Sequence, residues 1–258
     1  MQLITGFHAI EEKVRKASLS EKIEGLSLLL AKSGPRIKKI LEIAKKSGIP
    51  VQNCDLKTLD EMVKSLPEVA REHRGLVLQI QGESTKAEND IDFDQWILEN
   101  SKKDESEKSL VVVLDSVTDP HNVGAILRSC DQFGVNLVIL PERNSANDFQ
   151  HNEIIARSSA GASAYVPVSV VTNLVRTVQI LKENGFWVYG ADAGGTSVEK
   201  IDYANKTVLI MGSEGTGISR LLKEQCDSIA SIPTCGKIDS LNVSVATGIL
   251  LYDIYRRN

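Results

Sequence analysis

Two polar loops near the C-terminus have residue types that could bind a ligand. Residues 208–211 form an apolar run typical of a strand, and the loop 212–217 that follows contains three glycines in six residues. A second apolar run, 228–233, leads to the polar residues 239–242. In open α/β sheets, ligands bind outside the carboxyl ends of the strands. Both loops are therefore candidates for a binding site.

The glycine loop is not suited to a nucleotide phosphate. Gly212 and Gly217 have the spacing of a P-loop, but Ile218 occupies the lysine position and Glu214 lies inside the loop. A polyphosphate needs cationic partners, and a carboxylate repels it. The glycine order also differs from the dinucleotide fingerprint G-x-G-x-x-G. The loop is predicted to bring its backbone close to another kind of ligand, and a tight turn without a ligand is the alternative.

A third polar loop, 115–122, precedes a predicted helix at 123–133. Asn122 could cap that helix, because Asn is common at this position. Arg128 falls off the apolar side of the helix. Taken alone, this pattern favours Asn122 as a helix cap and Arg128 as a surface residue over a catalytic role for the two.

Neither the histidines nor the cysteines suggest a metal site. None of the four histidines has a carboxylate at metal or triad spacing, and the four cysteines lack zinc-ligand spacing. No metal is therefore expected. Core thiols without bridges are typical of a reducing compartment. No signal peptide or membrane-spanning run is found, so the cytoplasm is the predicted location.

The elements that must position these loops alternate between strands and helices. In residues 110–258 this alternation predicts a mainly parallel α/β sheet, with strands at 110–114, 136–140, 165–168 and 186–189 and helices at 153–159 and 173–182. Residues 1–81 read as a smaller α/β layer, with strands at 26–31, 50–54 and 76–80 and helices at 6–18, 35–46 and 56–66. The polar residues 82–109, apart from one short helical stretch, read as a linker.

Charge is distributed unevenly along the chain, which has a net charge of −4. Residues 1–81 carry 14 Lys+Arg and 10 Asp+Glu, residues 82–109 carry 4 and 9, and residues 110–258 carry 12 and 15. Only the N-terminal part is net positive, with basic residues at 32, 36, 38, 39, 45 and 46. These residues form either a solvated helix face or a footprint for RNA phosphates.

Three ordered motifs resemble those of the SpoU family, a branch of the SPOUT RNA methyltransferases. They are DPHNVG with Arg128, GSEGTGIS, and SIP followed by DSLNVSVATGILLYD. The resemblance implies that the catalytic residues are Asn122, Arg128, Glu214, Ser240 and Asn242. It also implies that Gly212, Ile232 and Leu241 line a site for S-adenosyl-L-methionine.

The resemblance also implies a fold and a partner. Residues 110–258 look like a mainly parallel-sheet α/β knot, a trefoil-knotted catalytic domain that acts as a homodimer with its active site near the dimer interface. GFHAIEEKV and HRGLVLQI, in residues 1–81, look like the family's ribosomal-protein-like α/β domain, which binds the RNA substrate.

The stretch TNLVRTVQILKENGFWVYG is similar to the ribosomal-RNA guanosine 2′-O-methyltransferase subgroup. The expected activity is therefore methylation of a ribose 2′-hydroxyl in large-subunit ribosomal RNA. A transfer-RNA ribose methyltransferase and a non-catalytic RNA-binding module are the alternatives. A hydroxyl is a poor nucleophile until its proton is drawn away. Arg128 is expected to hydrogen-bond the 2′-oxygen as it loses that proton. Glu214 either shapes this site or satisfies N–H groups of its own loop.

Overall fold

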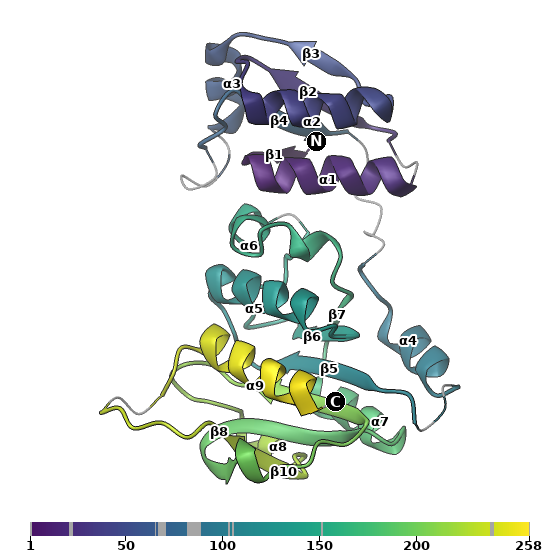
Figure 1. The fold of residues 1–258 in the computed structure, drawn as a ribbon, viewed down its shortest axis with the longest axis vertical. Helices are drawn as coiled ribbons and strands as arrows, with labels where there is room; N and C mark the ends of the chain where they lie inside the picture. Colours follow the sequence, from purple (N-terminus) through teal and green to yellow (C-terminus); the bar gives the residue numbers. More distant parts are fainter. Residues whose placement is uncertain are drawn as a thin grey trace. The chain divides into compact units, whose positions relative to one another are not determined.

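The computed structural model describes residues 2–20, 23–64, 66, 71–81, 89–102, 104, 106–150, 152–237 and 240–257 (Figure 1). Contacts between residues divide the chain into two compact units. Unit 1 comprises residues 1–87 and 149–164, and unit 2 comprises residues 88–148 and 165–258. None of the helices in the described residues is long and apolar enough to cross a membrane.

Unit 1 contains a four-stranded sheet in the order β1-β4-β2-β3. Its strands are β1 (Gln2–Ile4), β2 (Leu26–Leu30), β3 (Val51–Asn53) and β4 (Leu76–Ile80). β2 and β3 are parallel, and the other pairs are antiparallel. The three predicted strands are present. The short strand β1 was not predicted.

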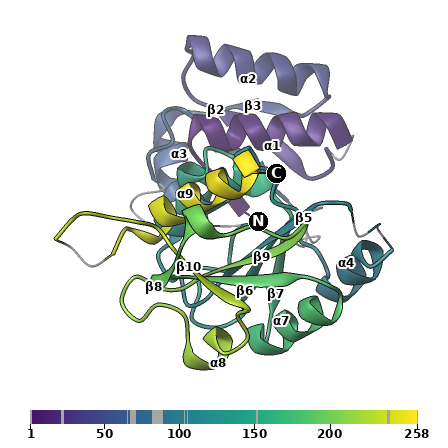
Figure 2. The same cartoon turned by 60° about the horizontal axis from the view of Figure 1, so that its bottom comes forward.

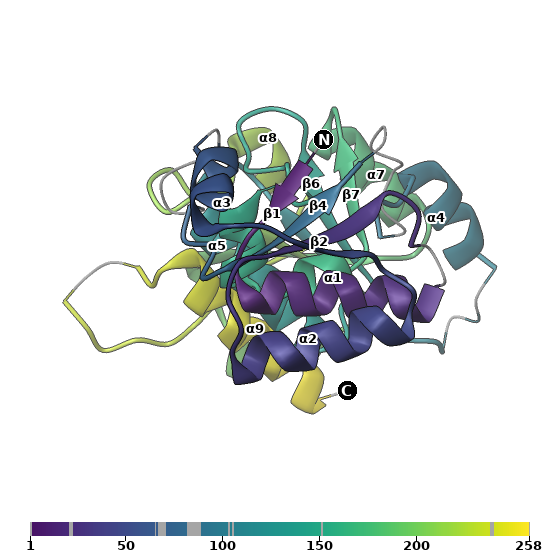
Figure 3. The same ribbon diagram turned by 90° about the horizontal axis from the view of Figure 1, so that it is seen from above.

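Helices cover both faces of this sheet, as Figure 3 shows: α1 (Phe7–Ser20) and α2 (Pro35–Lys46) lie side by side on one face, and α3 (Leu56–Val63) on the other. The apolar residues of α2 recur at helical spacing and pack on the sheet through Ile37, Ile40 and Ala44. α1 packs beside it, so the outer faces of both helices remain available to polar side chains.

Residues 149–164 contribute α6 (Glu153–Ser158) to unit 1, although they lie within the predicted second domain. The Thr5 hydroxyl donates a 2.6 Å hydrogen bond to Glu153 Oε2, and the Thr5 N–H donates to Oε1 at 3.3 Å. Burial raises the pKa of the Glu153 carboxyl, and the bonds from Thr5 oppose that rise. The compact units therefore do not coincide with continuous stretches of sequence.

Unit 2 contains a six-stranded sheet in the order β10-β8-β9-β5-β6-β7, and every pair in it is parallel (Figure 2). Its strands are β5 (Ser109–Leu114), β6 (Leu137–Pro141), β7 (Val168–Val171), β8 (Trp187–Ser197), β9 (Lys206–Met211) and β10 (Ser228–Ser231). The prediction of a mainly parallel sheet is confirmed. The predicted strand at 165–168 was placed too early. Pro167 has no N–H to donate, and β7 begins after it.

Helices cover both faces of this sheet too. α4 (Phe93–Asn100), α7 (Leu174–Glu183) and α8 (Arg220–Lys223) pack on one face, and α5 (Pro120–Gln132) and α9 (Val243–Arg257) pack together against the other. α4 is the helical stretch predicted inside the linker. Its residues Phe93 and Ile97 are buried in the unit 2 core, so this part of the predicted linker belongs to a packed layer.

Candidate active site

Three of the predicted site residues meet at the carboxyl ends of strands in unit 2. Asn122, in the first turn of α5, donates from Nδ2 to Glu214 Oε1 at 3.0 Å. Asn242 donates from Nδ2 to Asn122 Oδ1 at 3.0 Å and also to Glu214 Oε1. These residues lie up to 120 positions apart in the sequence. The fold therefore joins the first, second and third motifs in one polar cluster.

The alternative role for Asn122, a helix cap, is wrong. Asp119 caps α5 instead, accepting a 2.8 Å hydrogen bond from the His121 N–H, and Pro120 occupies the first helical position. Proline is favoured there because its fixed φ suits the helix and its missing N–H is not needed. The helix starts three residues earlier than predicted, which leaves the Asn122 amide available to Glu214.

Asn242 serves two purposes at the start of α9. Its Oδ1 accepts hydrogen bonds from the Ser244 N–H at 3.0 Å and the Val245 N–H at 3.3 Å, which satisfies the first turn of the helix. Its Nδ2 meanwhile reaches Asn122 and Glu214. The same side chain thus fixes the helix start and ties it to the glycine loop.

Glu214 links three segments of the chain. Its Oε1 accepts from Asn122, from Asn242 and, at 3.5 Å, from the Val243 N–H. Each of these three donors lies outside the 212–217 loop. The alternative in which Glu214 satisfies N–H groups of its own loop therefore does not describe these bonds. A carboxylate that accepts from two amides and a backbone group holds all three in a defined arrangement.

The glycine loop closes on itself. The Ser213 N–H donates to Gly217 O at 3.2 Å, and the Gly217 N–H donates to Ser213 O at 2.9 Å. Gly217 has φ of +65°, a conformation that favours glycine. A Cβ on Gly212 would lie 2.1 Å from the Gly217 carbonyl carbon. Gly212 is thus required by its own loop, which is a different reason from the predicted close approach to a ligand.

This crowding predicts a difference between two glycines of the same loop. Gly212→Ala should destabilise the protein by about 1–3 kcal/mol, because the new methyl group collides with backbone. A Cβ on Gly215 meets no atom within 4 Å, so Gly215→Ala is the matched control for stability. Thermal unfolding of the two variants measures the difference. Equal melting temperatures would show that the loop adapts and that the crowding has no energetic consequence.

Asp115, a buried residue directly after β5, was not among the predicted site residues. Its Oδ2 accepts a 2.7 Å hydrogen bond from the Ser219 N–H, just after the glycine loop. An aspartate at the carboxyl end of a fully buried strand was the signal that could have identified it. Asp115 therefore ties the segment directly after the glycine loop to the end of β5.

Arg128 and Ser240 do not join the polar cluster. Arg128 is exposed on α5 and makes no hydrogen bond or ion pair with any residue that the structure describes. Ser240 is exposed, and its neighbours Ile238 and Asp239 lie outside the described residues. Within the described part of the chain, the guanidinium of Arg128 is therefore available to bind a further group.

The predicted cofactor residues fit a nucleoside that lacks phosphates. Leu241, which is 36% exposed, directly precedes Asn242, and Ile232 directly follows β10. The loop 212–217 contains no basic residue and contains one carboxylate. A loop without cations suits an uncharged adenosine group better than a polyphosphate.

Asp192 lies within β8. Its carboxylate accepts hydrogen bonds from Lys223 at 2.7 Å and from the Gly194 N–H at 3.1 Å, and these bonds lower its pKa. Among the described residues, no three His, Cys, Asp or Glu side chains come together as a metal-binding group.

Comparison with known proteins identifies both parts of the chain. Residues 109–252 match the SpoU rRNA methylase family, and residues 3–83 match the substrate-binding domain of RNA 2′-O ribose methyltransferases. A 23S rRNA (guanosine-2′-O-)-methyltransferase RlmB of Pseudomonas aeruginosa is 36% identical over 98% of this chain and 96% of its own length. An uncharacterized tRNA/rRNA methyltransferase of Borreliella burgdorferi is 40% identical over 90% of this chain and 98% of its own length.

A solved structure has the same fold. The SpoU methyltransferase AviRb from Streptomyces viridochromogenes, in complex with the cofactor AdoMet, superposes with a TM-score of 0.70 at 21% identity, covering 99% of this chain and 89% of that chain. The family match to more than half of the chain, together with relatives that align along nearly its full length, decides the assignment. The chain belongs to the SpoU rRNA methylase family and is an RNA 2′-O-ribose methyltransferase.

Proposed function

We propose that this enzyme methylates the ribose 2′-hydroxyl of a guanosine in large-subunit ribosomal RNA, with the Asn122–Glu214–Asn242 cluster as the framework of its active site. The observation that carries this proposal is Glu214, which accepts hydrogen bonds from both other members of the cluster beside the glycine loop. The similarity to RlmB over nearly the full chain favours the ribosomal substrate.

S-adenosylmethionine supplies an activated methyl group on its sulfonium centre, and the chain supplies orientation and charge. Gly212, Ile232 and Leu241 would hold this cofactor. The exposed Arg128 donates hydrogen bonds to the 2′-oxygen and stabilises the negative charge that develops as the proton leaves. Arginine stays protonated in proteins, so it acts as a donor rather than as the base. The 2′-oxygen gains the methyl group, and the proton passes to solvent or to a substrate phosphate.

Asn122, Asn242 and Ser240 position the ribose, and Glu214 fixes the two amides. With Glu214 Oε1 as their shared acceptor, the amide planes of Asn122 and Asn242 have a defined orientation. Ser240, two residues before Asn242, would extend this polar surface toward the substrate.

The direct test is to map the modification. Wild-type protein, labelled S-adenosylmethionine and an unmodified transcript of large-subunit ribosomal RNA should give one 2′-O-methylguanosine. Methylation of unmodified transfer RNA instead would support the alternative that the enzyme is a transfer-RNA ribose methyltransferase. RNA binding with no methyl transfer and no calorimetric signal for S-adenosylmethionine would support the RNA-binding module.

We also propose a homodimer formed through α9. This helix presents an apolar stripe of exposed side chains at helical spacing, Val245, Ile249, Tyr252 and Tyr255. Phe133 packs against both tyrosines, with ring centroids 6.0 Å and 5.8 Å away, and so widens the apolar surface. Exposed stripes of this kind mark sites of association between proteins.

Placing a charge in this stripe should separate the subunits. Ile249→Arg is expected to shift the protein from dimer to monomer in sedimentation velocity and to reduce methyl transfer. Leu221→Arg, on the exposed side of α8, is the matched control, because that residue is also exposed. A dimer that persists in Ile249→Arg would remove α9 from the proposed interface.

Family membership further supports a trefoil knot in the C-terminal part of unit 2. It also supports separate roles for the two domains, in which residues 1–81 bind RNA and residues 110–258 carry out catalysis. For the compartment we propose the cytoplasm, since Cys54, Cys130, Cys226 and Cys235 are all free thiols.

A further inference from the structure

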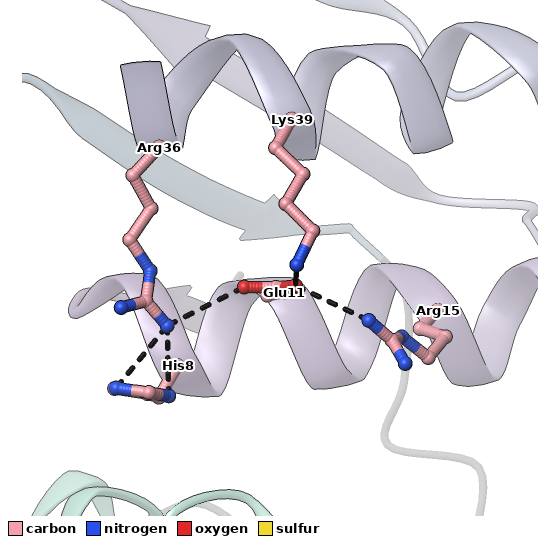
Figure 4. A network of polar contacts seen from close by, with 5 residues as sticks. All are labelled: His8, Glu11, Arg15, Arg36 and Lys39. Carbon is pink, nitrogen blue, oxygen red and sulfur yellow. Dashed lines mark hydrogen bonds and ion pairs between the residues drawn. The ribbon is translucent and has the colours of Figure 1, made fainter. Parts of the chain in front are cut away.

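One side of unit 1 has a cluster of basic side chains held by a single buried carboxylate. Glu11, on α1, accepts from Lys39 Nζ at 2.9 Å, from Arg15 at 3.2 Å and from Arg36 at 3.5 Å. Lys39 and Arg36 reach it from α2, and Arg15 reaches it from the next turn of α1 (Figure 4). The ion pairs of Glu11 therefore connect α1 with α2.

The carboxylate is buried and the cations are exposed. The Glu11 side chain is 7% exposed, whereas those of Arg15, Arg36 and Lys39 are 47%, 44% and 62% exposed. Burial alone would raise the pKa of Glu11, but the hydrogen bond from Lys39 and the three positive charges lower it, so the carboxylate stays ionised. One negative and three positive charges leave a surplus of two positive charges at the surface.

His8 extends the cluster along α1. Its ring nitrogens lie 3.0 Å and 3.1 Å from Arg36 Nη2 (Figure 4). The guanidinium thus lies between His8 and Glu11, while the Arg36 side chain stays 44% exposed. A guanidinium held in one orientation loses less freedom when it binds a phosphate, which increases affinity.

We propose that Glu11 is a positioning residue that organises Arg15, Arg36 and Lys39 into a binding site for backbone phosphates of the substrate RNA. The surplus of two positive charges matches two phosphodiester groups. This inference rests on the proposed function and sharpens it. The other lysines of α2, Lys38, Lys45 and Lys46, make no ion pair with any described residue and belong to the solvated face.

Removing the negative charge of Glu11 distinguishes a role in organising the cations from a purely electrostatic effect, because the two predict opposite changes in RNA affinity. Glu11→Gln raises the net charge by one, so bulk electrostatics alone would strengthen RNA binding. If Glu11 organises the cations, the variant should instead bind RNA about tenfold more weakly, because three side chains lose their order. Glu42→Gln is the matched control, since Glu42 is exposed on α2 and forms no ion pair with any residue that the structure describes. It should bind RNA as tightly as wild type or slightly more tightly.

A second pair of variants keeps the test valid if Glu11→Gln lowers stability. Arg36→Gln with Lys39→Gln removes two charges from the cluster, and Lys45→Gln with Lys46→Gln removes two from the solvated face of the same helix. The cluster pair should reduce the salt slope of RNA binding by about 1.4, at roughly 0.7 per phosphate contact. The control pair should change it little.

The measurements use the full chain and an unmodified transcript of large-subunit ribosomal RNA, with affinity followed from low to high salt. Thermal unfolding and calorimetry with S-adenosylmethionine accompany each variant. Equal losses in the cluster and control pairs, or stronger RNA binding by folded Glu11→Gln, would overturn the inference and leave the proposed function standing. A wild-type protein that methylates no RNA would instead overturn the proposed function.

Discussion

Arg128→Ala should lower methyl transfer to RNA by about a thousandfold, the loss typical of removing a donor that stabilises developing charge. The expectation rests on two observations. Arg128 is exposed on α5, six residues after Asn122, and it has no partner among the described residues. Because no described residue is held by Arg128, its removal should leave the fold intact. Single-turnover rates with saturating S-adenosylmethionine would measure the loss.

Two further variants test whether the loss of methyl transfer is specific to the guanidinium of Arg128. Arg128→Lys should remain severely impaired, because a point charge does not replace the planar fork of the guanidinium. Arg176→Ala, which removes an exposed arginine from α7 on the opposite face of the sheet, is the matched control and should keep full activity. Calorimetry should give near wild-type affinity for S-adenosylmethionine in all three. If Arg128→Ala retains most of its turnover, the residue has no direct role.

The sequence predicted the composition of the site better than its geometry. Asn122, Glu214 and Asn242 could be selected because three ordered motifs resemble one family. Their mutual hydrogen bonds span as many as 120 residues, and local periodicity has no information about contacts at that range. The start of α5 was misjudged for a local reason, because Asn122 is a plausible cap until Asp119-Pro120 is read as the cap and first helical residue.

Tertiary packing also gives Gly212 a role within its own loop that its spacing in the sequence did not indicate. Gly212 was expected to approach a ligand, but the atoms that exclude a side chain there belong to Gly217 and Ile218 of the same loop. Spacing alone does not distinguish a loop that folds back on itself from one that surrounds a ligand. The parallel sheet, in contrast, followed from the alternation of strands and helices, because parallel neighbours require such crossovers.

The second large effect concerns RNA recruitment. A fragment of residues 89–258 should bind S-adenosylmethionine and dimerise like the full chain, yet methylate ribosomal RNA about a hundredfold less efficiently at moderate salt. Residues 89–258 carry 15 Lys+Arg and 22 Asp+Glu, so this part of the chain is negatively charged and must modify a polyanion. The basic surface organised by Glu11 is absent from it.

The fragment must begin at residue 89, because the packed structure of unit 2 begins there. The Val168 N–H donates to Asn89 O at 2.7 Å, the Ile91 N–H donates to Val168 O at 2.8 Å, and Phe93 and Ile97 are buried in the core. A fragment starting at residue 110 loses both apolar side chains and should be less stable by about 3–6 kcal/mol, at roughly 1.5–3 kcal/mol for each. With that shorter fragment, a loss of activity could come from instability and not from the loss of RNA binding.

Steady-state kinetics on ribosomal RNA over a range of salt concentrations separates the two possible sources of RNA affinity. If residues 1–81 recruit the RNA, the fragment's deficit should appear mainly in KM and should shrink as salt weakens the full-length protein. If the catalytic dimer holds the RNA by itself, the fragment will match the full chain at every salt concentration. That result would assign the basic residues of α2 to an ordinary solvated helix face.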